Sequence, residues 1–254
     1  MGLLGEIKPV KKPILGVSLY PEQESMEEIE NYLTMASRYG FTKIFTSMFS
    51  VPGTKEEVFD YFKNFCDLAH KHGMKVSGDC NTAFFKKMGA SESDISIFKE
   101  MGIDIIRMDL PYFDQRDVTL INNPYNITIE LSSCMIQAVR MALENGANPK
   151  NFSTCHNFYP ERYTASDLKS IRSINKGLAT LGIPSAVFIS SNEDNTHGPW
   201  PVHDGLPTVE DHRWILAELQ VRHWIAVGDV DAERSGLLAS AGLQGRRAGH
   251  AIPL

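Results

Sequence analysis

The stretch of the chain richest in reactive groups is a loop of nine residues, 154–162, with the sequence Thr-Cys-His-Asn-Phe-Tyr-Pro-Glu-Arg. It follows a short run at 151–153 and precedes a helix that we expect to open at Thr164, with Asp167 three residues on. A turn that only joins a strand to a helix needs a few residues and a helix cap. The loop therefore indicates a functional site, to which we assign His156, Asn157, Tyr159 and Arg162. The alternative is a loop whose imidazole and phenol are hydrogen-bonded core groups.

Three carboxylates stand at or near the ends of predicted strands, namely Asp79, Asp109 and Glu130. Cleavage of a glycosidic bond requires such a pair, because one carboxyl group protonates the leaving oxygen while the other acts as nucleophile or activates water. Glu130 ranks first, because a glutamate within an otherwise apolar strand is costly to bury without a role or a partner. The alternative for Asp79 or Asp109 is a helix cap or an ion pair with Arg107. His156 could ligate a metal beside these carboxylates, but a lone histidine is more often a hydrogen-bonded core residue, and we expect no metal.

The remaining candidates for substrate binding also come from predicted strand ends and from one later loop: Tyr20, Arg107, Ser190, Ser191 and Trp200. Hydroxyl groups after the seventh strand suit a phosphate, although adjacent serines are common in loops. The loop at 198–207 contains three prolines, which preset its path. Its tryptophan could cover the face of a sugar or pack on the rim of the fold.

These residues lie on a repeated pattern of strand, polar loop, capped helix and glycine. Strands are predicted at 14–20, 43–48, 74–79, 103–110, 127–131 and 184–190. A further strand, the sixth in chain order, is predicted immediately before the 154–162 loop. Capping boxes begin several of the predicted helices, as in Ser25 with Glu28 and Thr54 with Glu57. The stretch between the fourth and fifth strands shows no strong helical period, and Thr208 with Asp211 is expected to cap the last helix.

Seven such units in 254 residues predict an α/β fold of the TIM (β/α)8 type, with its site at the C-terminal ends of the strands. The sequence contains no G-x-G-x-x-G and no P-loop, so we expect no nucleotide cofactor, nor any other. The eighth unit is the exception, because no β-branched run follows Val230. We therefore expect an N-terminal extension at 1–13 and a catalytic barrel at 14–230 with an incomplete or irregular eighth unit. An irregular tail at 231–254 would stand in place of the last strand.

Composition limits the partners. The formal net charge is -6, from 25 Lys and Arg against 31 Asp and Glu, which argues against nucleic acid as a partner. The four cysteines are scattered without a C-x-x-C pair, which indicates free thiols in a reducing compartment. No apolar run is long enough to cross a bilayer, and no secretory signal is evident. We expect a cytoplasmic protein with a small-molecule substrate, and we predict no particular oligomeric state.

Several strings in the sequence together resemble one family. They are Gly-Val-Ser-Leu-Tyr-Pro-Glu at 16–22, Ile-Phe-Thr-Ser at 44–47, Ile-Arg-Met-Asp-Leu at 106–110, Asn-Pro-Tyr at 123–125, Ile-Glu-Leu-Ser at 129–132, the string at 155–162, Gly-Pro-Trp-Pro at 198–201 and Gly-Leu-Pro-Thr at 205–208. The chain resembles the MupG-type 6-phospho-N-acetylmuramidases from about residue 14 to residue 231. The His-Asn-Phe-Tyr-Pro and Gly-Pro-Trp-Pro strings carry the most specific part of this similarity.

The resemblance implies a cytoplasmic TIM-barrel glycosidase. Its substrate would be a phosphosugar, 6-phosphorylated N-acetylmuramic acid linked to N-acetylglucosamine, taken up during cell-wall recycling. The family usually adds a small β domain after the barrel, which we expect to be lacking here. Two alternatives remain open: a barrel that binds the phosphosugar without turnover, and a metal-dependent lyase or isomerase that uses Asp79, Asp109, Glu130 and His156.

Overall fold

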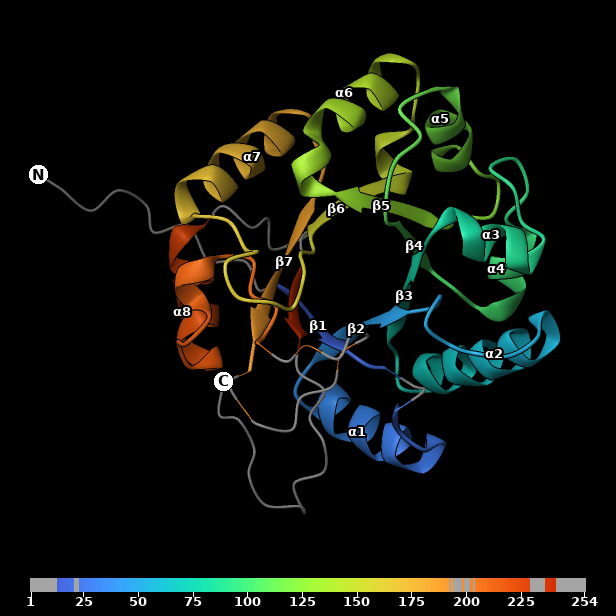
Figure 1. Ribbon diagram of the computed structural model, residues 1–254, viewed down its shortest axis with the longest axis horizontal. Coiled ribbons are helices and arrows are strands. Elements are labelled where there is room, and N and C mark those ends of the chain that lie inside the picture. Colours follow the sequence, from blue (N-terminus) through green and yellow to red (C-terminus); the bar gives the residue numbers. More distant parts are fainter. Residues whose placement is uncertain are drawn as a thin grey trace, which may run out of the picture.

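Eight parallel strands form a closed barrel in the computed structural model. The structure describes residues 13–20, 23–191, 193, 198, 202 and 204–228, together with the backbone of 236–240. The strands, in chain order and in barrel order, are β1 Ile14–Ser18, β2 Phe41–Ser47, β3 Lys75–Cys80, β4 Ile105–Met108, β5 Thr128–Ser132, β6 Phe152–His156, β7 Ser185–Ser190 and β8 Gly236–Ser240. Figure 1 shows this ring of strands with helices around it. The predicted TIM-type α/β fold is confirmed.

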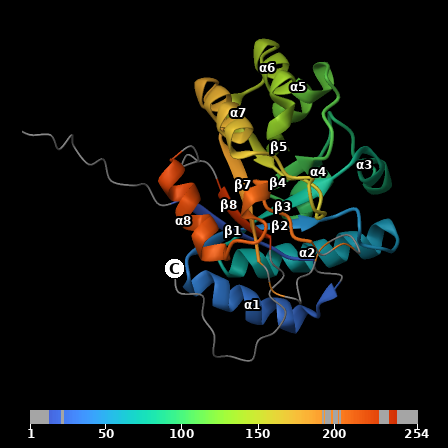
Figure 2. The same cartoon turned by 60° about the vertical axis from the view of Figure 1, so that its left-hand side comes forward.

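The helices form the outer layer. They are α1 Met26–Arg38, α2 Lys55–Lys71, α3 Thr82–Met88, α4 Ser96–Met101, α5 Gln115–Ile121, α6 Ile136–Glu144, α7 Leu168–Thr180 and α8 Ala217–Val227, with short 3-10 turns η2 Ser133–Met135, η3 Pro149–Asn151 and η4 Glu210–His212. The two long helices α1 and α2 lie side by side on the outer wall (Figure 2). Fully buried apolar side chains of strands and helices, such as Ile44, Phe62 and Leu33, pack between the two layers.

Helix starts follow the predicted caps in two of four cases. Ser25 and Thr54 each accept the predicted bond from the glutamate at the third position, so both capping boxes are present. The prediction for α7 was wrong by three residues, because Asp167 itself is the cap and binds the N–H of Ser170. The prediction for the last helix was also wrong. Thr208 instead bonds the backbone of β6 and β7, and α8 begins only at Ala217.

The expectation that an irregular tail stands in place of the last strand was wrong for residues 236–240. Gly236–Ser240 pairs in parallel with β1 on one side and with β7 on the other, and thereby closes the barrel. The segment contains no β-branched residue, so its strand conformation comes from two neighbours that each need a partner rather than from local propensity. The remainder of the predicted tail lies outside the described residues, as do residues 1–12 of the predicted N-terminal extension.

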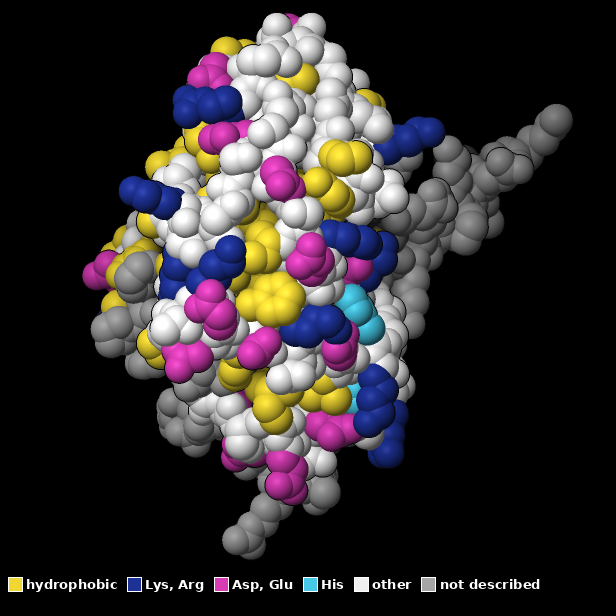
Figure 3. All heavy atoms as spheres, turned by 90° about the vertical axis from the view of Figure 1, so that its right-hand side faces the viewer, with side chains coloured by type: hydrophobic (Ala, Val, Ile, Leu, Met, Phe, Trp, Pro, Cys, Tyr) yellow, Lys and Arg dark blue, Asp and Glu magenta, His cyan; other side chains and the backbone are white. Residues whose placement is uncertain are grey.

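Charges of both signs are mixed on the face that contains α2, α3 and α4. Figure 3 shows Lys and Arg side chains there interspersed with Asp and Glu around a few hydrophobic ones. Within the described residues, no helix combines the length and the apolar character needed to cross a bilayer.

Candidate active site

Arg107 of β4 joins two carboxylates at the C-terminal ends of neighbouring strands. It is the register partner of Asp79 on β3, so the two side chains lie on the same face of the sheet. Nη1 of Arg107 donates to Oδ1 of Asp79 at 2.8 Å and to Oδ1 of Asp109 at 3.2 Å. The two carboxylate oxygens therefore lie no further apart than the sum of these distances. The structure brings together three of the predicted site residues at the end of the barrel where TIM-barrel sites lie.

The two carboxylates differ in environment. The side chain of Asp79 is 10% exposed, whereas that of Asp109 is 55% exposed. Burial raises the pKa of Asp79 above its usual range, although the guanidinium of Arg107 acts in the opposite direction. One buried carboxyl group with a raised pKa beside an exposed one is the arrangement that separates an acid from a nucleophile or base.

Buried polar atoms without a hydrogen-bond partner lie on the inner face of the barrel, on Arg107 itself and on the neighbouring strands β1 and β2. Among the described residues, the hydroxyls of Ser18 and Ser47 and Nε of Arg107 are buried and have no hydrogen-bond partner. Ser47 is the register partner of Asp79, and Ser18 is the register partner of Phe45, whose ring packs inside the barrel. A buried donor without a partner is costly, and it commonly marks a place where a ligand or water completes the bonding. These donors can bind the oxygen atoms of a polar substrate.

Glu130 occupies a different position. Its side chain is 1% exposed, and Nζ of Lys43 lies 2.9 Å from its Oε2. Ser153 also donates to Oε2, at 3.2 Å, and Ser77 donates to Oε1, at 3.5 Å. Burial alone would raise the pKa of Glu130, but the charge and the hydrogen bond of Lys43 hold it below its usual value. Both carboxylate oxygens are thus engaged inside the barrel, which argues against the leading catalytic role predicted for this residue.

His156 turns away from the barrel interior. On β6 the inward positions are Ser153, which bonds Glu130, and Cys155, which packs with the interior rings, so the next residue faces the helices. His156 is fully buried there, with Nε2 2.7 Å from Oδ1 of Asn175 on α7. Burial lowers the pKa of His156 to about 4. The predicted contact of His156 with substrate does not fit this placement, whereas the alternative of a hydrogen-bonded core histidine does.

The rest of the 154–162 loop lies at the rim of the barrel. Asn157 is half-buried, and Tyr159 is 41% exposed. Arg162 contacts Asp204 through both its backbone N–H and its Nε, each at 3.3 Å. Arg162 and Asp204 therefore connect this loop with the loop after β7. Asn157, Tyr159 and Arg162 remain proposed substrate-binding residues.

A buried ion pair fixes the same two loops. The guanidinium of Arg213 is 1% exposed and binds both carboxylate oxygens of Glu210, at 2.5 and 2.6 Å. Its Nη1 also donates to the carbonyl oxygens of Asp204 and Gly205. Glu210 in turn accepts the backbone N–H groups of Tyr163 and Ala165. Hydrogen bonds to Arg213 hold the pKa of Glu210 at about 2 despite partial burial.

The serines predicted to bind phosphate already have partners. The hydroxyl of Ser190 is buried, accepts the N–H of Leu206 at 3.0 Å and contacts the carbonyl of Ser191. Ser191 accepts the N–H of Glu193 at 3.2 Å. Both hydroxyls thus hold the loop after β7, which weakens their predicted role. Tyr20 is buried at the end of β1, and Trp200 lies outside the described residues.

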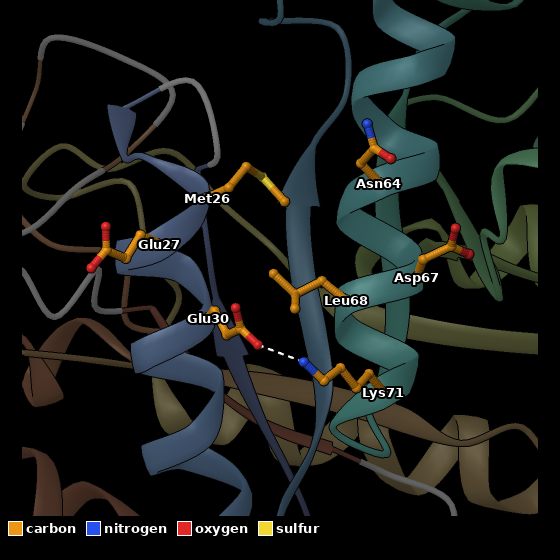
Figure 4. Close-up of a pocket in the computed structure, with 7 residues that line it drawn as sticks. All are labelled: Met26, Glu27, Glu30, Asn64, Asp67, Leu68 and Lys71. Atoms are coloured by element: carbon orange, nitrogen blue, oxygen red, sulfur yellow. Dashed lines mark hydrogen bonds and ion pairs between the residues drawn. The ribbon is translucent and has the colours of Figure 1, made fainter.

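A groove of about 480 Å³ lies elsewhere, on the outer wall between α1 and α2. An ion pair between Glu30 and Lys71 crosses it (Figure 4). Because the sites of TIM barrels lie at the C-terminal ends of the strands, we assign no catalytic role to this groove. In the part of the chain that the structure describes, no three His, Cys, Asp or Glu side chains gather as a metal ion requires.

Sequence reasoning missed Lys43, Glu210 and Arg213. The signal for Lys43 was present, because the argument that a charged residue inside a strand needs a partner applies to it as it does to Glu130. It was overlooked because β2 begins at Phe41, two residues before the predicted strand, so that Lys43 became a terminal residue in the prediction. Glu210 and Arg213 had no signal beyond their spacing of three residues on a turn.

The closed barrel with a carboxylate pair at its C-terminal end defines the chain as a TIM-barrel protein. It belongs to the family described as 6-phospho-N-acetylmuramidase, N-terminal (MupG_N), whose sequence profile matches residues 15–233. A search among curated proteins found no match.

Solved structures of other proteins share the fold of this chain. The chain is 33% identical to an uncharacterized B. cereus protein, with a TM-score of 0.79 over 92% of this chain and 62% of the other. It is 22% identical to a conserved Enterococcus faecalis protein of unknown function, with a TM-score of 0.75 over 90% and 61%. A Thermotoga maritima DAHP synthase, 16% identical with a TM-score of 0.53 over 93% and 62%, shares the fold. The chain thus spans about three fifths of the length of these relatives.

Proposed function

We propose that this chain is a glycoside hydrolase that cleaves 6-phospho-N-acetylmuramic acid from N-acetylglucosamine in the cytoplasm, as part of cell-wall recycling. The observation that carries the proposal is the pair of carboxylates on Arg107, one buried with a raised pKa and one exposed. The family's description supplies the substrate class. The free cysteines fit a reducing compartment.

In the proposed mechanism, Asp79 is the general acid. The raised pKa of Asp79 favours its protonated form, which can donate a proton to the leaving sugar oxygen. Asp109, more exposed, acts on the anomeric carbon as nucleophile or through an activated water. The oxygens of the two groups that contact Arg107 lie closer together than the roughly 6.5–9.5 Å typical of an inverting pair, which favours a retaining reaction. Arg107 holds both groups in register.

Glu130 receives a supporting role in this proposal. Its ion pair with Lys43 lies in the barrel interior, where Ser77 and Ser153 also bind it. Arg162 at the rim is suited to a phosphate or to the lactyl carboxylate, because a guanidinium binds such anions through two hydrogen bonds. Binding without turnover is the second candidate, because Arg107 engages both carboxylates in the structure.

The test is hydrolysis of the 6-phosphorylated disaccharide by this chain, with the unphosphorylated disaccharide as control. Release of N-acetylglucosamine from the phosphorylated form alone supports the proposal. A folded sample that binds the phosphorylated form without releasing product supports the binding candidate instead. Equal cleavage of both forms contradicts the proposed substrate class.

A further inference from the structure

Two exposed aromatic residues share an unusual backbone conformation. Phe113, on the loop after β4, has a φ of 59° and a side chain that is 47% exposed. Tyr163, on the loop after β6, has a φ of 66° and is 88% exposed. Bulky residues rarely adopt this left-handed region, and such strain persists where the surroundings impose it. Among the described residues, Asn126 is the other non-glycine residue with positive φ, and asparagine tolerates that conformation well.

In both cases a carboxylate accepts the backbone N–H of the residue with positive φ and that of a nearby residue. Asp117, which is 5% exposed on α5, accepts the N–H of Phe113 at 2.8 Å and that of Tyr112 at 3.0 Å. Glu210 accepts the N–H of Tyr163 at 3.1 Å and that of Ala165 at 3.2 Å. Two unrelated loops thus use the same device to fix the backbone of an exposed aromatic residue.

Packing does not account for this device. A ring that is 88% exposed removes little apolar surface from water, so burial of Tyr163 offsets little of the backbone strain. The hydrogen bonds hold the backbone from which the ring projects, and the ring remains available to a ligand. Aromatic rings of this kind supply large contact areas with little loss of side-chain freedom on binding.

Both loops border the same end of the barrel. They follow β4 and β6, which flank β5 in the ring of strands (Figure 1). Phe113 comes four residues after Asp109, so its Cα lies within about 14 Å of the Cα of that residue. Tyr163 directly follows Arg162, which is tied to Asp204 at the rim.

We propose that Phe113 and Tyr163 are two sugar-binding positions at the rim, each of which packs against the apolar face of a pyranose ring. They hold a substrate of at least two sugars across the Asp79 and Asp109 pair. This inference rests on the proposed function, because it takes its ligand class from the glycosidic site.

The experiment replaces each ring by asparagine, in Phe113→Asn and Tyr163→Asn, because asparagine keeps the left-handed backbone. On the phosphorylated disaccharide we expect KM to rise about three- to tenfold per variant, with kcat changed less than twofold and an unchanged or higher melting temperature. Phe113→Tyr and Tyr163→Phe should keep the wild-type KM. Tyr39→Asn is the matched control, because Tyr39 is also 40% exposed but follows α1 at the opposite end of the barrel.

Wild-type KM in both asparagine variants overturns the inference while leaving the proposed function intact. If the wild-type chain does not turn over the disaccharide, calorimetric titration of the same compound replaces KM by Kd, with the same expected ratios. Unchanged Kd values then overturn the inference, and a wild-type chain that neither cleaves nor binds the disaccharide overturns both proposals. Glycine at each position provides a second variant that tolerates the backbone, should asparagine lower the melting temperature.

Discussion

Nζ of Lys43 on β2 lies 2.9 Å from Oε2 of Glu130 on β5, inside a barrel whose wall separates both from the helices. The two strands are not neighbours in the sheet, so this ion pair crosses the interior. Nearly complete burial means that each charge depends on the other, because removing one partner leaves an uncompensated charge in a low-dielectric interior.

Removing one partner should therefore destabilise the fold strongly. We expect Lys43→Met to lower the free energy of unfolding by about 3–5 kcal/mol, and Lys43→Met with Glu130→Leu to recover most of that loss. Urea denaturation of the single and double variants measures both values. Lys71→Met is the control, because its ion pair with Glu30 is exposed and its loss should matter little. Equal effects of Lys43→Met and Lys71→Met would contradict the prediction.

The buried imidazole of His156 should make stability depend on pH. Its pKa is about 4 in the fold and near 6.5 when unfolded, so the unfolded chain binds the proton more readily between these values. Stability from this group is present above pH 6.5 and is lost as pH falls toward 4. We expect wild type to lose about 2 kcal/mol more than His156→Gln between pH 7 and pH 5. Unfolding free energies at the two pH values test this.

A second histidine also contributes to the pH dependence of stability in this range, so the contribution of His156 has to be measured by comparing variants. Burial also lowers the pKa of His212 to about 4, and His212→Gln provides the matched variant. Each single variant should lose part of the pH dependence, and the double variant most of it. An unchanged pH dependence in His156→Gln would show that this imidazole titrates normally in the fold.

More of the barrel than of the candidate site could be predicted from the sequence. Periodicity and capping boxes located seven strands and the starts of α1 and α2, because those signals are local. Helices α3 and α5 were not predicted, since each has only seven residues, which is too few to show a clear helical period. The strand β8 was not predicted for another reason. Its conformation depends on pairing with β1 and β7, which lie far away in the sequence.

The sequence identified the polar residues at the strand ends, but it did not show whether each side chain faces the barrel interior or the helices. His156 and Cys155 are adjacent in the sequence, yet one faces the helices and the other the interior. Alternate residues of a strand face the same side, so the inward residues of β6 can be counted once one of them is known. Ser153 is known to face inward only because β6 pairs with β5 and Ser153 is the register partner of Glu130. The pair of Asp79 and Asp109 was predictable as an ion-pair group around Arg107, whereas the burial difference between them was not.

The ion pair of Glu210 with Arg213 should stabilise the rim loops down to acidic pH. The pKa of Glu210 is about 2 in the fold and about 4.5 unfolded, so its contribution is present above pH 4.5 and is lost as pH falls toward 2. Glu210→Gln should therefore melt at a lower temperature than wild type at pH 6, with the gap closing toward pH 2. Melting curves across this range measure the gap. Glu100→Gln, on the exposed surface of α4, should show no such closing gap.

The proposed roles of Asp79 and Asp109 predict different responses to the leaving group. Asp79→Asn removes the proton donor, so kcat on the disaccharide should fall at least about 100-fold. An aryl glycoside whose phenol leaves without a proton should be cleaved by Asp79→Asn much more nearly at the wild-type rate, whereas Asp109→Asn should fail on both substrates. Asp67→Asn on α2 is the control and should leave both rates unchanged. If Glu130→Gln loses turnover while Asp79→Asn retains it, the acid is Glu130 and its ion pair with Lys43 must open during the reaction.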